Sequence, residues 1–388
     1  MMIIGSRFQP VGHGFLHMTN FPHEMLREIY EQPQALRRTL DRYLGEWGLK
    51  PEIGEKLSRW VNPAGEILIA ASGSSRHCGL YAEILLEDLC GLAVDVEYAS
   101  EYSLRGGSDI RHPSVLVLSQ SGETSDTLAA LEEARRQGHS TLAITNAPSS
   151  TMAVEADFSM PLVAGAERAI PATKSFTCQL AVLYLLALYE GMHLGQLDPE
   201  IVNELIPELK AVPATLERQL DGWTEQMRLL AHKYADASTF LYLGRGIHYA
   251  IAREGALKMK EASYIHAEGY PVGELKHGPN ALVSDHVPLV VLATVDRRLD
   301  ASVRRYEKTL HLLAELKTQG AKVIAVANAD DTRVPPLATE LVRVHPVSEY
   351  LLPILEVVPL QLFAYFMAQE HGVDVDRPRN LSKAVVEK

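Results

Sequence analysis

The strongest constraint on how this chain can fold is a strand, loop and helix order that repeats along it. Apolar strand patterns lie at residues 66–71, 94–98, 114–118 and 141–145. Loops of small polar residues, at 72–75 and 119–124, follow the first and third strands, and helical patterns over 76–89 and 125–137 come next. Strands that alternate with helices in this way predict a doubly wound parallel sheet of the α/β class.

The same order returns in the second half of the chain. Strand patterns at 240–243, 289–294 and 322–327 alternate with helical patterns from residue 248 and over 301–318. Two tandem copies of one α/β unit are the simplest account. We expect an N-terminal helical segment (1–65), a first α/β domain (66–198), a helical linker (199–225), a second α/β domain (226–372) and an irregular C-terminal tail (373–388). Breaks in the linker helix are expected at Pro199, Pro207 and Pro213.

The composition limits the partners of the protein. The 388 residues carry a net charge of −12, which lacks the basic footprint of nucleic-acid binding. The longest strongly apolar stretch, Ala181–Leu188, is far shorter than the roughly 18 residues of a bilayer span, and residues 1–10 lack the core of a signal peptide. We therefore expect a cytoplasmic protein without nucleic-acid or membrane partners. Cys78, Cys90 and Cys178 are widely spaced and predict buried thiols, and no metal or cofactor site is expected.

Hydroxyl side chains gather in the two small-residue loops, at Ser74, Ser75, Ser119, Ser121 and Thr124. Both loops follow parallel strands and precede helices, where free backbone N–H groups and the helix dipole favour an anion. Serine and threonine are also ordinary helix N-caps, so each loop alone is open to that interpretation. Two such loops at one sheet edge favour a phosphate site.

Other phosphate and hydrolase motifs are missing from the sequence. The second copy has residues 294–297, Thr-Val-Asp-Arg, where the first has its second serine loop, and these offer no comparable anion cradle. There is no P-loop motif, and residues 244–249 do not complete a dinucleotide fingerprint. Ser121-Gly122 lacks the nucleophile elbow of serine hydrolases. The sequence therefore does not support an NTPase, a Rossmann dehydrogenase or a serine hydrolase.

Acidic and basic residues cluster at the first helix of the second copy. Glu254, Lys258 and Glu261 are spaced i, i+4 and i+7, so they share one helix face, which in isolation is usually a solvated salt-bridged face. The segment 263–281, which we interpret as an insertion, follows at once and carries titratable side chains at His266, Glu268, Glu274, Lys276 and His277. His266 and Glu268 are equally compatible with a structural role. A carboxylate, an imidazole and an amine together suit proton transfer beside a carbonyl and imine formation. Lys383, in the polar tail, is a further candidate amine if the tail folds over the serine loops.

These motifs resemble the isomerase half of glucosamine-6-phosphate synthases, which is built from two sugar isomerase (SIS) domains. The resemblance covers nearly the whole chain and rests on residues 28–33, 119–127, 254–258, 263–268, 273–279 and the tail through Lys383. It implies an enzyme acting on a phosphosugar, without a cofactor, as a homodimer.

The resemblance also implies roles for individual residues. It implies that Glu261 moves a proton between C1 and C2 with Lys258 beside it, and that Lys383 forms an imine with the ketose. His277 would open the sugar ring in the site of the neighbouring subunit, oriented by Glu254. The sugar phosphate would be held by Ser74, Ser75, Ser119, Gln120, Ser121 and Thr124, with Ile170 and Ala172 beside the substrate.

Two departures separate this chain from the synthases it resembles. It begins with too few residues before Glu24 to hold their glutaminase domain, so we expect no use of glutamine by this chain itself. Residues 166–176 carry Ala172 where the synthases have a serine, and look closer to amino-sugar-phosphate deaminases. The leading hypothesis is a deaminase that converts glucosamine 6-phosphate to fructose 6-phosphate and ammonia. Alternatives are a glutamine-independent or partner-fed synthase, a plain sugar-phosphate isomerase, and a non-catalytic phosphosugar sensor.

Overall fold

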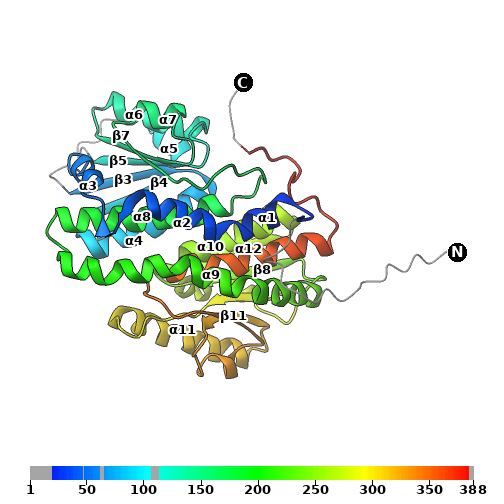
Figure 1. The fold of residues 1–388 in the computed structure, drawn as a ribbon. Helices are drawn as coiled ribbons and strands as arrows, with labels where there is room; N and C mark the ends of the chain where they lie inside the picture. The colour runs from blue at the N-terminus through cyan, green and yellow to red at the C-terminus, as the bar shows by residue number, and fades with distance from the viewer. Residues whose placement is uncertain (1–19, 47, 62–64, 106–112, 384–388) are drawn as a thin grey trace.

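The computed structural model describes residues 20–46, 48–61, 65–105 and 113–383. Two α/β halves lie at opposite ends of the molecule, with a thick layer of long helices between their sheets (Figure 1). Parts of the expected N-terminal segment and tail, residues 1–19, 62–64 and 384–388, lie outside the described residues.

The first half contains a fully parallel sheet in the order β4-β3-β5-β6-β7. Its strands are β3 (Glu66–Ala71), β4 (Ala93–Tyr98), β5 (Ser114–Ser119), β6 (Thr141–Thr145) and β7 (Phe158–Pro161). Its helices are α4 (Gly73–Cys90), α5 (Ala99–Leu104), α6 (Ser125–Arg136), α7 (Thr151–Glu155) and α8 (Lys174–His193). β5 and β6 are buried along their whole length, as expected for strands covered by helices on both faces.

The second half repeats this architecture with the parallel order β9-β8-β10-β11-β12. Its strands are β8 (Thr239–Gly244), β9 (His266–Pro271), β10 (Leu289–Leu292), β11 (Val323–Asn328) and β12 (Glu340–Val344). Its helices are α10 (His248–Ser263), α11 (Asp300–Thr318) and α12 (Leu352–Glu370), with 3₁₀ turns at Val272–His277, Pro279–Leu282 and Pro335–Leu337. In both halves the chain order of the strands is second, first, third, fourth, fifth, so the predicted tandem doubly wound fold is confirmed.

The segment 263–281 is not an insertion, as the sequence pattern suggested. Its residues His266–Pro271 form β9, which pairs with β8 as β4 pairs with β3 in the first half. β9 lies at the sheet edge and is mostly only partly buried, so it carries no apolar run that would mark it as a strand. The 3₁₀ turns after β9 stand where the first copy has α5, and the 3₁₀ turn Pro335–Leu337 stands where it has α7.

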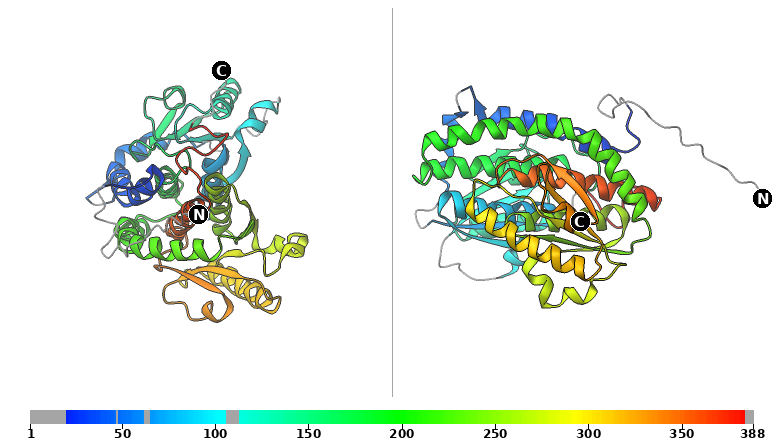
Figure 2. Two further views of the ribbon diagram at one scale, coloured as in Figure 1. Left: turned by 90° about the vertical axis from the view of Figure 1, so that its right-hand side faces the viewer. Right: turned by 90° about the horizontal axis from the view of Figure 1, so that it is seen from below.

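The linker is one helix rather than several. α9 (Pro199–Lys233) continues past residue 225, and Pro207 and Pro213 lie inside it, so the expected breaks at these prolines are wrong. Pro199 does begin the helix, at a position where its missing N–H costs nothing. α9 packs against α2 and α12 (Figures 1 and 2), and this apolar packing offsets the two lost hydrogen bonds.

The N-terminal region is helical, as expected. It contains α1 (Glu24–Tyr30), α2 (Gln32–Tyr43) and α3 (Pro51–Leu57), with a short antiparallel pair of β1 (Leu44–Gly45) and β2 (Gly48–Leu49). Pro33 lies in the first turn of α2, which explains the interruption between the first two helices.

Two helices of the central layer, α8 and α12, are long and apolar enough to cross a membrane by length and composition. Their apolar windows are 94% and 89% buried inside the molecule, which is typical of core helices in globular proteins. Cys78, Cys90 and Cys178 are buried free thiols, as predicted.

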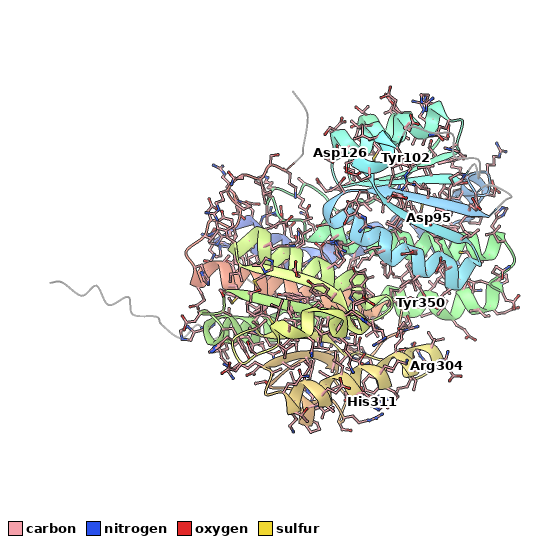
Figure 3. The ribbon with its side chains drawn as sticks, turned by 180° about the vertical axis from the view of Figure 1, so that it is seen from behind. Asp95, Tyr102, Asp126, Arg304, His311 and Tyr350 are labelled. Carbon is pink, nitrogen blue, oxygen red and sulfur yellow. The ribbon has the colours of Figure 1, made fainter. Side chains whose placement is uncertain are left out.

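The two halves contact each other directly along helix α4 of the first half. Tyr81 donates a hydrogen bond to the carbonyl of Tyr350 at 2.8 Å, and the Tyr350 hydroxyl donates to Asp88 at 3.2 Å. Figure 3 shows Tyr350 at the junction of the two halves. Helix α4 of the first half also packs on α10 of the second, so side chains from both copies meet there.

Candidate active site

A cavity of 260 Å³ lies where the strand order of the first sheet reverses, between the loops that follow β3 and β5. Such a switch point is where open α/β sheets bind ligands. The structure brings most of the predicted site residues to its walls, namely Ser74, Ser75, Ser119, Gln120, Ser121, Thr124, Ile170, Ala172, Lys258, Glu261 and Lys383.

The serine loop after β5 is held by its own hydroxyl groups. The Ser119 hydroxyl lies 3.0 Å from that of Thr124 and accepts a hydrogen bond from the Gly122 N–H at 3.1 Å. Ser121 accepts from the Glu123 N–H at 3.2 Å. Thr124 is the N-cap of α6, but its side chain makes no capping hydrogen bond. Simple N-capping therefore does not explain Thr124, which lines the cavity.

The predicted acid and base residues lie on the face of α10 that meets the first domain. The Lys258 ammonium lies 2.5 Å from the Glu261 carboxylate and 3.4 Å from that of Glu254, and it donates to the Ser74 hydroxyl at 3.2 Å. Burial opposes the charge on Lys258, but the two carboxylates outweigh it and raise its pKa. Lys258 therefore remains an ammonium beside Glu261.

Glu254 lies beneath the cavity and is fully buried. It accepts hydrogen bonds from Ser74 at 2.9 Å and contacts His77 Nδ1 at 2.8 Å. Burial alone would raise the pKa of Glu254, but Lys258, His77 and Ser74 lower it, so the carboxylate is charged. The imidazole of His77 is almost fully buried, and this burial lowers its pKa and keeps it neutral.

The C-terminal tail carries Lys383 to the cavity wall. Its ammonium donates to the Glu167 carboxylate at 2.8 Å and to the Ala169 carbonyl at 2.6 Å. Glu167 is fully enclosed, and although burial opposes its ionisation, Lys383 and the N–H groups of Ser175 and Thr173 lower its pKa. The tail is fixed upstream by Asp376, which accepts the N–H groups of Glu24 and Met25 at 2.8 Å each.

Glu254 and His277 are the predicted site residues that do not line the cavity; Glu254 contacts its wall at Ser74, whereas His277 does not. His277 lies exposed at the end of a 3₁₀ turn. Within the described residues, the side-chain partners of Glu254 are Ser74, His77 and Lys258, not His277. The predicted contact between Glu254 and His277 is therefore not made within the described part of this chain.

The equivalent place in the second half is filled by the chain itself. Thr294, which follows β10, donates a hydrogen bond to Glu356, and His248 contacts the same carboxylate at 2.8 Å. Glu349 contacts His248 at 3.5 Å and Arg305 at 2.7 Å. Burial opposes the charge on His248, but Glu356 and Glu349 raise its pKa to about 10. An enclosed ion cluster thus replaces the anion cradle, in agreement with the loss of serines from this loop.

Sequence reasoning missed two residues that support the site. His77 contacts Glu254, and Glu167 pairs with Lys383. The only signal for His77 is its helical i, i+3 spacing from Ser74, and Glu167 lies far from Lys383 in sequence. Without the fold, neither the spacing of His77 nor the position of Glu167 in the sequence identifies it as the partner of a site residue.

The fold and this cavity define a tandem α/β protein whose first copy has a hydroxyl-lined cavity at its switch point and whose second copy contributes Lys258 and Glu261 to the wall. Comparison with known families matches residues 61–189 and 233–369 to the SIS domain, and the chain belongs to this family.

The similar proteins agree with this assignment. Glutamine–fructose-6-phosphate aminotransferase (isomerizing) from Thermus thermophilus is 43% identical over 368 residues, which cover 94% of this chain and 59% of that protein. The protein of the same name from Methanosarcina mazei is 41% identical over 376 residues. The chain thus spans 59% and 58% of the length of these relatives.

Solved structures show which part of such proteins the chain matches. The C-terminal domain of glucosamine-fructose-6-phosphate aminotransferase from Francisella tularensis superimposes with a TM-score of 0.83 at 32% identity, covering 92% of this chain and 98% of that one. A glucosamine-6-phosphate deaminase from Thermotoga maritima, at 22% identity and a TM-score of 0.69, shares the fold. The chain therefore corresponds to the isomerase part of the aminotransferases.

Proposed function

We propose that this protein interconverts an amino-aldose 6-phosphate, with glucosamine 6-phosphate as the first candidate, and a ketose 6-phosphate with free ammonia. One observation carries the proposal, namely that a hydroxyl-rich loop, the Lys258–Glu261 pair and the Lys383 amine line one cavity. A phosphosugar of six carbons presents a phosphate, an exchangeable carbon-bound proton and a carbonyl carbon, one for each of these groups.

The phosphate is held by neutral donors in this proposal. The serine loop presents hydroxyls and the N-terminus of α6, whose dipole favours an anion. Such a cradle binds phosphate without an arginine clamp, which is compatible with the net charge of −12. The sugar chain then extends from Ser121 and Thr124 toward α10 and Lys383.

The Glu261 carboxylate is the proposed proton carrier. In the open-chain amino-aldose it removes the proton from C2 and returns it to C1, which converts the amino aldehyde to a C2 ketimine with a C1 alcohol. The charged Lys258 ammonium, 2.5 Å from Glu261, stabilises the negative charge that develops on O1 during this transfer.

Lys383 is the proposed nucleophile toward C2. Glu167 lies 2.8 Å from its ammonium and can accept a proton, which frees the amine to attack the ketimine and expel ammonia. Water then hydrolyses the lysine imine and regenerates the amine. The balance is one amino-aldose 6-phosphate and one water to one ketose 6-phosphate and one ammonia.

Ring opening is assigned to His277 of a neighbouring subunit in a homodimer. The proposal is supported by the exposed position of His277 and by the fully buried Glu254, which is charged and has no contact with His277 of its own chain. A buried carboxylate can orient and charge an incoming imidazole.

The experiment is to offer the purified protein glucosamine 6-phosphate, galactosamine 6-phosphate and glucose 6-phosphate separately, and to measure ammonia and ketose. Ammonia released with ketose from one amino sugar supports the proposal and names the sugar. Ketose without ammonia from glucose 6-phosphate indicates a plain isomerase. Turnover only in the synthetic direction, from fructose 6-phosphate with ammonium or glutamine, indicates a synthase. Thermal stabilisation by these phosphosugars without any turnover indicates a sensor.

A further inference from the structure

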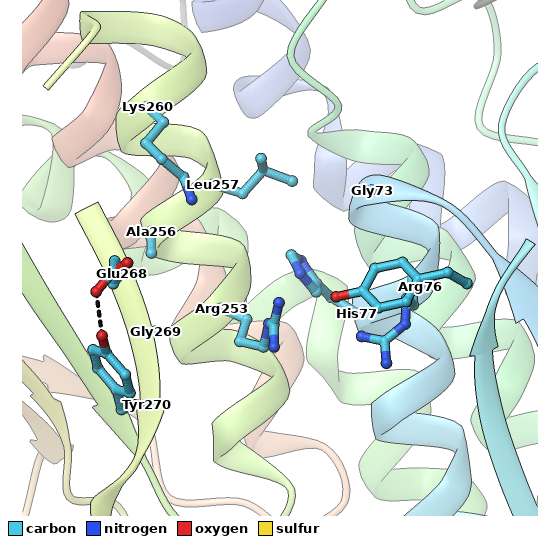
Figure 4. Close-up of a pocket in the computed structure, with 11 residues that line it drawn as sticks. Gly73, Arg76, His77, Arg253, Ala256, Leu257, Lys260, Glu268, Gly269 and Tyr270 are labelled. Atoms are coloured by element: carbon cyan, nitrogen blue, oxygen red, sulfur yellow. Dashed lines mark hydrogen bonds between the residues drawn. The ribbon is translucent and has the colours of Figure 1, made fainter. Parts of the chain in front are cut away.

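A second cavity, of 320 Å³, lies between the two halves, with His77 in its wall, and adjoins the first cavity at Gly73. Its walls come from the start of α4 and the end of β4 in the first half and from α10 and β9 in the second, as Figure 4 shows. This volume is at the lower end of the range for small-molecule sites. No step of the proposed reaction uses it.

The charges in this cavity are out of balance. Arg76, Arg253 and Lys260 line it, and in the described part of the chain none of the three forms an ion pair with a carboxylate. Glu268 is the one carboxylate among the lining residues, and its side chain accepts a hydrogen bond from Tyr270. Three positive charges against one negative leave a net charge of +2 in a protein whose total is −12.

Aromatic rings, rather than carboxylates, hold the two guanidinium groups. Arg76 stacks on the Tyr98 ring, with its Cζ atom 3.8 Å from the ring centre. Its Nε is buried and has no hydrogen-bond partner within the described part of the chain. Arg253 donates to the Tyr249 hydroxyl at 3.0 Å. Burial lowers the pKa of Arg76, and the positive charge of Arg253 lowers it further. Two like charges are thus fixed close together with hydrogen-bond donors left over.

We propose that this cavity binds the phosphate monoester of a small organic molecule, at a site separate from the one proposed for the substrate. A dianion would neutralise the excess charge of two, and its oxygens match the forked donors of two arginines. Lys260 contributes a third cation at the rim. The neutral His77 imidazole and the Tyr98 and Tyr270 phenols can contact an uncharged remainder of the ligand.

The test uses glycerol 3-phosphate as the probe and calorimetric titration of the full chain. The double variant Arg76→Gln with Arg253→Gln should weaken one class of binding at least about tenfold, because each arginine supplies charge-assisted hydrogen bonds. The double variant Ser121→Ala with Thr124→Ala should weaken only the other class. Arg228→Gln, an exposed arginine on α9, is the matched control and should bind the probe as the native protein does.

Unchanged probe binding by the double arginine variant would overturn the proposal. If that variant fails to fold, Lys260→Gln replaces it, because the Lys260 side chain is exposed and its loss cannot unfold the core. Lys260→Gln should weaken the same class of binding a few-fold, and no change would likewise overturn the proposal. Glycerate, the matching carboxylate, should bind this site more weakly, and equal affinity would exclude phosphate recognition. Since the readout is binding, the result does not depend on the proposed reaction.

Discussion

A buried lysine between two carboxylates is the chemical centre of the proposed active site. Lys258 and Glu254 are both fully buried, and moving such charges out of water costs several kcal/mol each unless they are paired. Their partners are Ser74 and His77 from the first half and Glu261 from the same helix. The charged groups are therefore stable only when both halves are folded against each other.

Glu261→Gln should abolish proton exchange at the substrate carbons and leave binding of the phosphosugar nearly unchanged. The amide keeps the size of the side chain but cannot accept the C2 proton, and loss of a general base typically lowers turnover about 10²-fold to 10⁴-fold. The measurement is washout of deuterium from C2-labelled substrate, followed by NMR. Glu132→Gln, on the exposed side of α6, is the control that should exchange normally. Exchange by Glu261→Gln at the native rate would remove Glu261 from its role.

Glu190 offers a test of stability that is independent of the site. It lies in α8 with no exposed area, and among the residues that the structure describes neither carboxylate oxygen has a hydrogen-bond partner. Burial raises its pKa from 4.5 to about 8. The unfolded chain loses this proton above pH 4.5, whereas the folded protein keeps it until about pH 8, so the native state loses stability as the pH rises across this window.

Glu190→Gln should therefore stabilise the protein in a pH-dependent way. The amide resembles the protonated acid and does not titrate, so the two proteins should have similar stability near pH 4.5. At pH 7 the variant should be more stable by roughly 3 kcal/mol, since each pKa unit corresponds to about 1.4 kcal/mol. Urea unfolding at several pH values measures this difference. A difference that does not grow with pH would show that Glu190 ionises normally in the folded state.

At the scale of elements, the serine loop depends on the glycine at its tip. Gly122 has φ +67°, and a Cβ atom there would lie 2.0 Å from the Ser150 hydroxyl, which caps helix α7. Gly138, after α6, has φ +79° but open space around it. Both positions strain an L-residue, but only Gly122 also meets a steric barrier.

Gly122→Ala should displace the loop and weaken phosphosugar binding by at least about tenfold, because the clash must be relieved by moving Ser119–Thr124 or Ser150. Gly138→Ala should cost only about 1–2 kcal/mol of stability and leave binding intact. Calorimetric titration with a phosphosugar and thermal unfolding of both variants separate the two effects. Equal binding by the two variants would show that the loop does not need its observed conformation.

Elements with clear periodicity could be predicted from the sequence, and those stabilised by neighbours could not. β3 and β5 are nearly continuous apolar runs, as is typical of buried parallel strands, and the sequence pattern predicts both within a residue of their observed bounds. β9 was missed because an edge strand needs no apolar run. α9 was expected to break at Pro207 and Pro213, but local propensity is overridden by its packing on α2 and α12.

The site shows the same division between local and distant information. The serine loop and the α10 face are contiguous in sequence, so spacing alone indicated them. The pairs His77–Glu254 and Glu167–Lys383 join residues 177 and 216 positions apart, and only the fold brings them together. Sequence reasoning therefore found the groups proposed for chemistry but not those that orient them.

At the scale of the whole molecule, the two copies give two switch points, and the first of them borders a cavity. The second is filled by two cations, His248 and Arg305, and two carboxylates, Glu349 and Glu356, whose charges balance one another. The second copy instead presents α10 to the first. The active-site cavity and the second cavity are therefore both lined by residues of both copies. In the proposed dimer, His277 would add a residue from a second chain to the active site.

Mixed dimers test whether His277 acts in the neighbouring subunit. Lys383 reaches the cavity of its own chain, so a His277→Ala chain keeps its amine and a Lys383→Ala chain keeps its imidazole. Each variant alone should be inactive. If the two are unfolded, mixed in equal amounts and refolded, random pairing in a twofold dimer gives half mixed dimers, each with one complete site and one empty of both groups.

The mixture should therefore regain about a quarter of the native turnover, because only mixed dimers carry a complete site. Recovery requires that His277 and Lys383 of one site come from different chains. If both act within one chain, no pairing can restore a complete site, and the mixture stays inactive. Native chains, unfolded and refolded in the same way, give the recovery against which the mixture is measured. The assay thus decides between a shared and a single-chain site without any knowledge of the interface.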